Sequence, residues 1–432
     1  MSPLTTASEA LPSLYEPVPL EMTRRHPVPL LRMTDIPAPE GHVDMARREL
    51  ATVLQYWGYR PEMWRIDGFT GPVTEQSYTA VAVAHPIVEV MRSSVVVRRQ
   101  SLSVSERTIV ARHMFMRYLA MRGLPVPALL DRPDGTTYAL VPVVPLTDPQ
   151  QASGFTYVIE DAIYEVQTYA HGRRFVTDGP GEDIYLEAAA ETLAALHRAS
   201  LDFPGPINRW PHERAMLAIA QASLTRIADS AREANISHPI AVGMRRLARE
   251  SAQWIAAAEA RLAAHPEIPW LHVHGDYQPH NLAFEADHVC AIYDFDATHW
   301  DRRVLELAYA LLTFAGLRWG EGAALAISAQ TPPLVEHGLD IERARAFLTA
   351  YGQSAPPQPG EADLLGDALL LMLPIVFANG VAEDIVLGDG ETRLIHPPRE
   401  WRAHLAWAET FPTWIEAHRA TLGDAWRSAV RH

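Results

Sequence analysis

The sequence contains one cysteine, Cys290, among 432 residues. A single cysteine cannot form an intrachain disulfide, and it cannot supply the several thiolates of a cysteine-based zinc or iron–sulfur site. Basic residues are also scarce, because 37 Lys and Arg stand against 52 Asp and Glu, which gives a formal net charge of -15. Nucleic acid is therefore not an expected partner, since binding it requires an excess of positive charge.

Long apolar runs are missing as well. The longest, Ala368 to Ala378, is interrupted by Pro374 and is too short to cross a bilayer. The first residues, MSPLTTASEALPS, lack the basic start and the apolar stretch of a secretory signal. We therefore expect a soluble, cytoplasmic protein with no membrane partner, and the sequence leaves its oligomeric state open.

Periodic patterns divide the chain into three regions. Residues 1–60 form a proline-rich arm followed by an amphipathic helix. Residues 61–168 contain short β-rich runs and one long helix, expected from Ser105 to Arg122. Residues 169–432 are mainly helical, apart from a β-rich block between Trp270 and Asp296. The pattern predicts an α+β fold with a small β-rich N-lobe and a larger helical C-lobe.

The two lobes are expected to join near residues Glu165 to Gly172. The β-rich run that leads to this junction, Phe155 to Tyr169, is expected to contain a turn at Asp161-Ala162.

The strongest functional signal is HGDYQPHN, which begins at His274 and is followed by DFD at Asp294. Phosphoryl transfer depends on positioning and charge neutralisation, so it needs a carboxylate beside the incoming hydroxyl and oxygen ligands for Mg²⁺. Asp276 and Asn281 are five residues apart across a tight loop and can point to one place. A β-hairpin would bring Asp294 alongside them. This arrangement favours a kinase.

A metal-dependent hydrolase is the rival interpretation. His272, His274 and Asp276 alternate along an expected strand, so three potential ligands share one face. However, Tyr277 stands where such a motif usually continues with another histidine, and the hydrolase leaves the amide and the DFD hairpin without a role. We therefore expect His272 to pack inside the fold and His274 to brace the loop through hydrogen bonds.

The block from His274 to Leu312 resembles the aminoglycoside phosphotransferase and choline kinase superfamily. That superfamily combines HGDxxxxN with a hydrophobic strand ending in DFD, and then an Arg before an acidic residue and Leu-Ala. Here residues 300–309 read WDRRVLELAY, and the resemblance extends over about Gly68 to Phe314. It implies a two-lobed kinase-like fold. It also implies ATP or GTP with Mg²⁺ as cofactors, and a small molecule with a hydroxyl group as acceptor.

The resemblance also implies roles for individual residues in the C-lobe. Asp276 would be the catalytic base, and Asn281 and Asp294 would be the Mg²⁺ ligands. Asp296 would support them, alongside His274.

In the N-lobe, the loop that ends at Ser77 would cover the phosphates, with Ser77 as a hydrogen-bond donor. The backbone from Gln167 to Tyr169 would hold the nucleobase.

One part of the family pattern is absent. The superfamily usually offers a strand lysine to the phosphates and pairs it with a helix glutamate. Here the strand ends Val97-Arg98-Arg99, so Arg98 is the expected phosphate cation, and Arg112 stands where the helix acid would be. The phosphate itself, or another acid such as Glu75, would then have to orient Arg98. A catalytically impaired, kinase-like nucleotide-binding protein is the alternative that this substitution leaves open.

The acceptor is the least defined part of the interpretation. Glu383, Asp384 and Asp389 lie in an acidic segment of the C-lobe, and several tryptophans are expected nearby. Acids and aromatic rings suit a cationic acceptor, such as an amino sugar, an aminoglycoside-like antibiotic or an amino alcohol. A solvated acidic loop and core tryptophans are the other interpretation, in which case a sugar without an amino group fits equally well.

Overall fold

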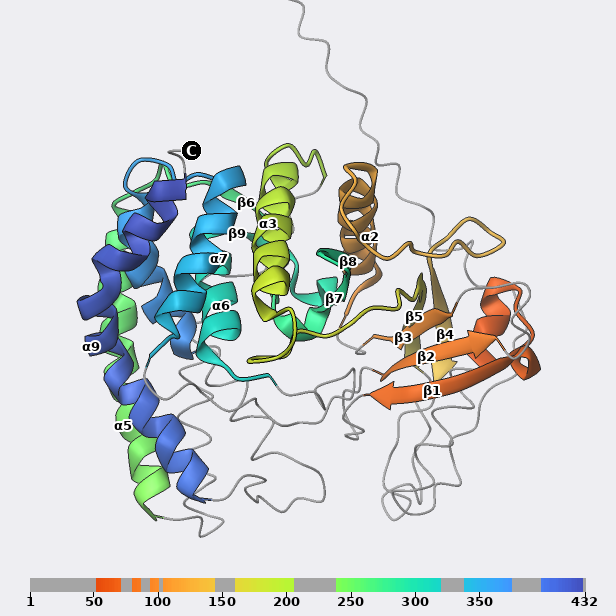
Figure 1. The fold of residues 1–432 in the computed structure, drawn as a ribbon. Coiled ribbons are helices and arrows are strands. Elements are labelled where there is room, and N and C mark those ends of the chain that lie inside the picture. Colours follow the sequence, from red (N-terminus) through yellow and green to blue (C-terminus); the bar gives the residue numbers. More distant parts are fainter. Residues whose placement is uncertain are drawn as a thin grey trace, which may run out of the picture.

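The computed structural model describes residues 52–70, 80–86, 94–100, 104–143, 160–205, 238–319, 338–374 and 398–429. In these ranges the N-terminal part is built on one antiparallel sheet and the C-terminal part mainly on helices (Figure 1). The α+β, two-lobed arrangement predicted from the sequence is confirmed.

The N-lobe sheet has five strands in the order β1-β2-β3-β5-β4. Their bounds are β1 (Trp64–Thr70), β2 (Ala80–Pro86), β3 (Val95–Arg99), β4 (Tyr138–Val143) and β5 (Glu160–Thr168). Valine dominates β3, as expected for a strand with neighbours on both sides. All five of its residues are buried, including Arg98 and Arg99, so this central strand carries two arginines into the interior.

The turn expected at Asp161-Ala162 is wrong. Both residues lie within β5, where Pro142 of β4 pairs with Asp161 and Val141 pairs with Ala162. Ala162 is fully buried and begins the run of buried residues that continues to Gln167, whereas Asp161 is exposed at the start of the strand. Neither residue is a glycine or a proline, and packing of Ala162 into the sheet core outweighs the weak turn preference of Asp161.

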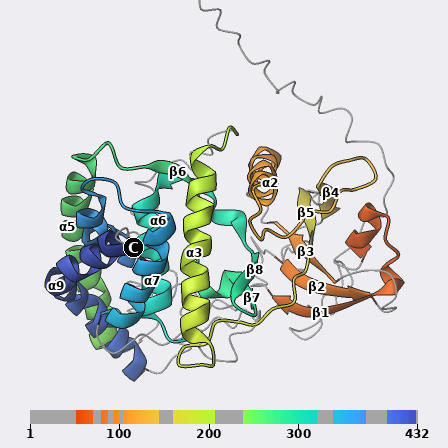
Figure 2. The same cartoon turned by 45° about the horizontal axis from the view of Figure 1, so that its top comes forward.

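Helix α2 (Glu106–Met121) lies beside the sheet, on the side that faces the helical lobe (Figures 1 and 2). The Ser105 side chain caps it by accepting the Thr108 N–H at 3.2 Å. Gly123, at φ +83°, follows its end and takes the left-handed conformation that terminates helices. Its buried residues include Arg112 and His113 as well as apolar side chains, so this helix also carries charge inward.

The C-lobe is a helical assembly around α6. Its helices are α3 (Glu182–Leu201), α5 (His238–Ala263), α6 (Arg303–Gly316), α7 (Ile341–Ser354) and α9 (Pro398–Ser428). Helix α6 is buried along nearly its whole length, whereas α5 and α9 run side by side at the far end from the sheet (Figures 1 and 2). None of the helices in these described ranges is long and apolar enough to cross a bilayer.

Two short two-stranded antiparallel sheets accompany the C-lobe helices. Strand β6 (Trp270–Val273) pairs with β9 (His299–Arg302), which follows much later in the chain, and β7 (Leu282–Glu285) forms a hairpin with β8 (His288–Ile292). The Tyr293 N–H donates to the Asn281 carbonyl at 2.8 Å and closes the open end of the β7–β8 hairpin. The hairpin predicted to bring Asp294 towards Asn281 is thus present.

Candidate active site

The loop after β6 has a shape that only glycine permits at one position. Gly275 has a φ of +82°, and a Cβ on it would lie 2.1 Å from the Ala297 carbonyl oxygen. Any other residue would need both an unfavourable backbone conformation and a shift of the neighbouring chain. This close approach presses the loop from His274 to Gln278 against the segment that begins at Asp294.

Glu306, on the first turn of α6, holds the backbone of this loop through hydrogen bonds. Its carboxylate accepts the backbone N–H groups of His274 at 3.1 Å and Gly275 at 2.6 Å, and it contacts His197 Nε2 at 2.8 Å. Burial alone would raise the pKa of Glu306, but the hydrogen bond and charge of His197 lower it below its ordinary value. A buried carboxylate on a rigid helix therefore fixes the loop backbone. The family pattern identifies Glu306 as the acidic residue before Leu-Ala but assigns it no role.

His272 in β6 and His274, just after its end, have different surroundings. The ring of His272 packs among Phe115, Phe203 and Trp300, with centroid distances of 5.5, 4.9 and 5.3 Å. His274 contacts the Tyr293 carbonyl through Nε2 at 2.8 Å and accepts the Asp276 N–H at Nδ1 at 3.2 Å. Because one ring nitrogen accepts, the other must donate, so His274 bridges the loop and the start of the DFD segment.

Asp276 is surrounded by hydrogen-bond donors. Gln278 Nε2 lies 2.9 Å from Oδ1 and 3.0 Å from Oδ2, while Asn281 Nδ2 lies 2.7 Å from Oδ2. The Tyr309 hydroxyl, which comes from α6, donates to Oδ1 at 2.5 Å. Burial, followed by the negative charge of Asp294, raises the pKa of Asp276 to about 6, and the bonds from Tyr309 and Gln278 oppose this rise.

Asn281 and Asp294 supply oxygen atoms beside Asp276. Asn281 uses its Nδ2 for both the carbonyl and the carboxylate of Asp276, which turns its Oδ1 away from that group. Asp294 lies two residues after the end of β8, with a φ of +63°. Among the contacts of the described residues, neither Asn281 Oδ1 nor Asp294 Oδ2 accepts a hydrogen bond. These two oxygens are the kind of hard ligand that Mg²⁺ prefers, so the donor set fits this ion.

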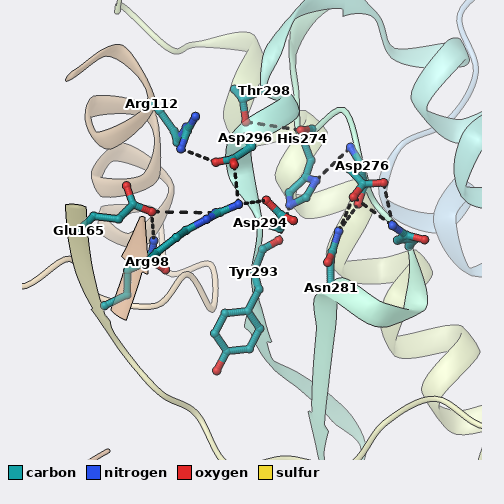
Figure 3. A network of polar contacts seen from close by, with 12 residues as sticks. Arg98, Arg112, Glu165, His274, Asp276, Asn281, Tyr293, Asp294, Asp296 and Thr298 are labelled. Carbon is teal, nitrogen blue, oxygen red and sulfur yellow. Dashed lines mark hydrogen bonds and ion pairs between the residues drawn. The ribbon is translucent and has the colours of Figure 1, made fainter. Parts of the chain in front are cut away.

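Two arginines of the N-lobe reach the two carboxylates of the DFD segment (Figure 3). Arg98 Nη2 donates to Asp294 Oδ1 at 2.8 Å and also contacts Asp296. Arg112, from α2, forms an ion pair with Asp296. Both arginines are at least nine-tenths buried, whereas the Asp294 and Asp296 side chains are 40% and 31% exposed, so these pairs join the two lobes at the border between the interior and solvent.

Glu165 of β5 completes this cluster. It is the cross-strand register partner of Arg98, is fully buried, and has its Oε1 3.9 Å from Arg98 Nη1. Its carboxylate also contacts His113 Nε2 at 2.9 Å and accepts the Gln167 side-chain amide at 2.9 Å. Burial alone would raise the pKa of Glu165, but His113 and the two arginines lower it to about 2. Two guanidinium groups therefore face three carboxylates.

The two DFD carboxylates respond differently to this cluster. Burial favours the neutral form of each, but the Arg98 guanidinium outweighs it at Asp294 and lowers that pKa below its ordinary value. At Asp296 burial dominates over Arg98 and Arg112, and the pKa is raised. Asp294 is thus the better anion of the pair and the better candidate for a cation ligand.

The acid beside Arg98 is a residue that sequence reasoning missed. Arg112 lacked an assigned function, and the suggested acid, Glu75, lies outside the described residues. The structure instead places Glu165 next to Arg98 and gives Arg112 to Asp296. The signal was present in the alternation of β5, which puts Glu165 on the same face as Gln167, but only the strand register reveals which residue it meets.

The segment expected to hold a nucleobase uses most of its backbone donors within the fold. The N–H of Thr168 donates to the Ala128 carbonyl at 2.9 Å, and that of Tyr169 donates to the Ser94 carbonyl at 3.0 Å. The Gln167 side chain is directed to Glu165. A contact between a nucleobase and the Tyr169 N–H would therefore have to replace an existing bond. Ser77 lies outside the described residues.

The acidic residues expected around the acceptor cannot be compared with the structure. Glu383, Asp384 and Asp389 lie outside the described residues. Trp407 is buried in the helical core, where its indole N–H donates to the Gly338 carbonyl at 2.8 Å. Trp414 stacks on His418, with ring centroids 4.3 Å apart. Within the described ranges, no group of three or more His, Cys, Asp or Glu side chains is arranged to hold a metal ion.

The chain belongs to the phosphotransferase enzyme family, whose model matches residues 87–347. No curated protein sequence matches the chain. Its structure is similar to that of a microcompartment-associated aminopropanol kinase, with a TM-score of 0.53 and 11% identity over 88% of this chain and 98% of that chain. This likeness shows the two-lobed kinase-like fold.

Other similar structures have lower scores. A choline kinase from Cryptosporidium parvum Iowa II has a TM-score of 0.43 and 11% identity, over 88% of this chain and 96% of that chain. An aminoglycoside phosphotransferase from Alicyclobacillus acidocaldarius has a TM-score of 0.43 and 15% identity, over 84% of this chain and 91% of that chain. Family membership identifies this chain as a small-molecule kinase that acts on a hydroxyl group.

Proposed function

We propose that the protein transfers the γ-phosphoryl group of ATP, or of another nucleoside triphosphate, to a hydroxyl of a small amino sugar, aminoglycoside-like antibiotic, amino alcohol or sugar. The observation that carries this proposal is the convergence of Asp276, Asn281 and Asp294 on one place, fixed by Gly275 and Glu306. Phosphoryl transfer depends on a positioned base and on oxygen ligands for a metal ion, and it needs little covalent chemistry from the protein.

In the proposed reaction, the acceptor oxygen forms a bond to the γ-phosphorus as the bond to the β-phosphate oxygen breaks. Asp276 lies beside the acceptor hydroxyl and takes its proton, so the products are a phosphate ester and a nucleoside diphosphate. Asn281 Oδ1 and Asp294 would hold Mg²⁺. The ion, when bound, neutralises charge on the β- and γ-phosphates. Contacts of His274 and Asp296 hold the loop and the DFD segment in place.

Arg98 is the proposed cation for the nucleotide phosphates. Its planar guanidinium can keep Nη2 on Asp294 and Asp296 while its other nitrogens offer N–H groups to a phosphate. Glu165, at 3.9 Å, supplies the negative charge that the helix lacks. This contact supports an active kinase over a catalytically impaired one, because the cation has an acid beside it without the nucleotide.

Replacement of Arg98 by Lys is expected to weaken ATP binding by about tenfold or more and to leave adenosine binding unchanged. A lysine keeps the charge but loses the fork that bridges two carboxylates and a phosphate. Titration calorimetry with both ligands measures the difference. Arg303→Lys is the matched control, because Arg303 is a buried arginine that contacts both carboxylate oxygens of Glu361 away from the site. An equal loss for ATP and adenosine would contradict the assignment.

The proposed function is tested by measuring nucleoside diphosphate release with Mg²⁺, ATP or GTP, and a panel of amino sugars, aminoglycosides, amino alcohols and neutral sugars. We expect release that depends on at least one of these alcohols, with one phosphate ester formed per diphosphate by phosphorus NMR. Turnover that proceeds equally without any added alcohol would identify a nucleotide hydrolase and contradict the proposal.

A further inference from the structure

The Asp276 carboxylate has no hydrogen-bonding position left over. A carboxylate has about four lone-pair sites, two on each oxygen. Oδ1 is contacted by Gln278 and Tyr309, and Oδ2 is contacted by Gln278 and Asn281. An alcohol that gives its proton to Asp276 must first bind to one of these sites, so it has to take the place of one existing donor.

The existing donors differ in how firmly they are held. Asn281 is tied to Asp276 twice, through the carboxylate and the backbone carbonyl. Gln278 lies two residues from Asp276 in the same loop and spans both oxygens. Tyr309 belongs to another element, α6, and touches the carboxylate through a single O–H group at 2.5 Å. Its contact has the same chemistry as an alcohol on a base, an O–H donating to a carboxylate oxygen.

We propose that the Tyr309 hydroxyl occupies the place on Asp276 Oδ1 that the acceptor hydroxyl takes during transfer. This inference rests on the proposed function, in which Asp276 is the base. Because the phenol covers that oxygen, a water molecule has to break the phenol's hydrogen bond without other contacts in return, so hydrolysis of the triphosphate is slow. A bound alcohol can offset the same loss through contacts made by the rest of its structure. Tyr309 is then a specificity-determining residue that favours alcohols over water.

The test replaces Tyr309 with Phe, which keeps the ring and removes only the hydroxyl. With water as the acceptor, kcat for Mg²⁺-dependent ATP hydrolysis is expected to rise about tenfold or more, the size of one charge-assisted hydrogen bond. The KM for ATP should stay unchanged, since Tyr309 contacts the base and not the nucleotide site. Tyr138→Phe is the matched control, because the Tyr138 hydroxyl also donates to a carboxylate, that of Glu106, in the N-lobe.

Unchanged or reduced hydrolysis in Tyr309→Phe, at an unshifted melting temperature, would overturn the inference and reduce Tyr309 to a residue that merely positions Asp276. A rise in Gln278→Met but not in Tyr309→Phe would overturn it too, since Gln278 would then be the donor that yields. In either case, alcohol-dependent diphosphate release by the wild type leaves the proposed function standing. Absence of any nucleotide turnover in the wild type and all variants would overturn both.

Discussion

Replacing Asp276 by Asn is expected to lower kcat by on the order of 10²–10⁴ or more while nucleotide binding and folding persist. The substitution removes the carboxylate that is proposed to take the acceptor proton and keeps the side-chain shape. Its new amide N–H₂ meets a site full of donors, but the Tyr309 hydroxyl can accept as well as donate, so the loop can accommodate the change. Single-turnover kinetics with saturating Mg²⁺-ATP and acceptor measure the effect on the chemical step.

The matched control is Asp367→Asn. Asp367 is also buried and hydrogen-bonded, to Arg261 at 2.6 Å and Arg419 at 2.9 Å, but it lies in the helical lobe away from the site. We expect Asp367→Asn to lower the melting temperature and leave kcat nearly unchanged. A kcat near that of the wild type in Asp276→Asn would remove Asp276 from its role as the base.

The part of the site that the sequence predicts best is the part made by local contacts. Asp276 and Asn281 are close because five residues form one loop, and Asp294 joins them because a two-stranded hairpin returns the chain. A short separation along the sequence restricts how far apart these side chains can lie. A motif of this length therefore brings its residues close together, and contacts such as those of Glu306 then fix the loop backbone.

The rest of the site is made by contacts between distant segments, which spacing does not limit. Glu165 meets Arg98 because β5 pairs with β3 in one particular register, and a slip by one residue would point Glu165 to the opposite face. Arg112 meets Asp296 only because α2 packs against the DFD segment. Tyr309 reaches Asp276 from α6. A single sequence shows that these residues are charged or polar, but their partners follow from the packing of the two lobes.

The charged residues around Arg98 differ from the family pattern, and electrostatics explains how the difference is compensated. With an arginine in the helix instead of an acid, α2 brings a second positive charge to the DFD segment and neutralises Asp296. The negative charge next to Arg98 then comes from the neighbouring strand, through Glu165. The cluster holds three carboxylates against two guanidinium groups, and this excess of negative charge supports the proposed binding of Mg²⁺.

Replacing Asp294 by Asn is expected to abolish the metal-dependent part of nucleotide binding. Asn is the right replacement because Asp294 has a φ of +63°, a conformation that Asn adopts far more readily than Ala or any branched residue. The substitution removes the negative charge of Asp294. The Arg98 guanidinium lowers the pKa of this carboxyl group and so keeps it ionised. Because even groups that only support a metal ligand contribute 10–100-fold to affinity, loss of a charged ligand should weaken Mg²⁺ binding by about 100-fold or more.

The measurement is the rise in melting temperature that ATP produces with and without Mg²⁺. In the wild type we expect Mg²⁺ to increase the ATP-induced rise, and in Asp294→Asn we expect equal rises in both conditions, since Arg98 remains available to the phosphates. Asp178→Asn controls for the backbone, because Asp178 also has a positive φ, of +58°, and lies exposed outside the site. Should Mg²⁺ still increase the rise in Asp294→Asn as it does in Asp178→Asn, the ion is not bound by Asp294. The oxygens of Asn281 and Asp276 would then be the remaining ligands near the phosphates, and Arg98 would be the permanent counter-ion of Asp294.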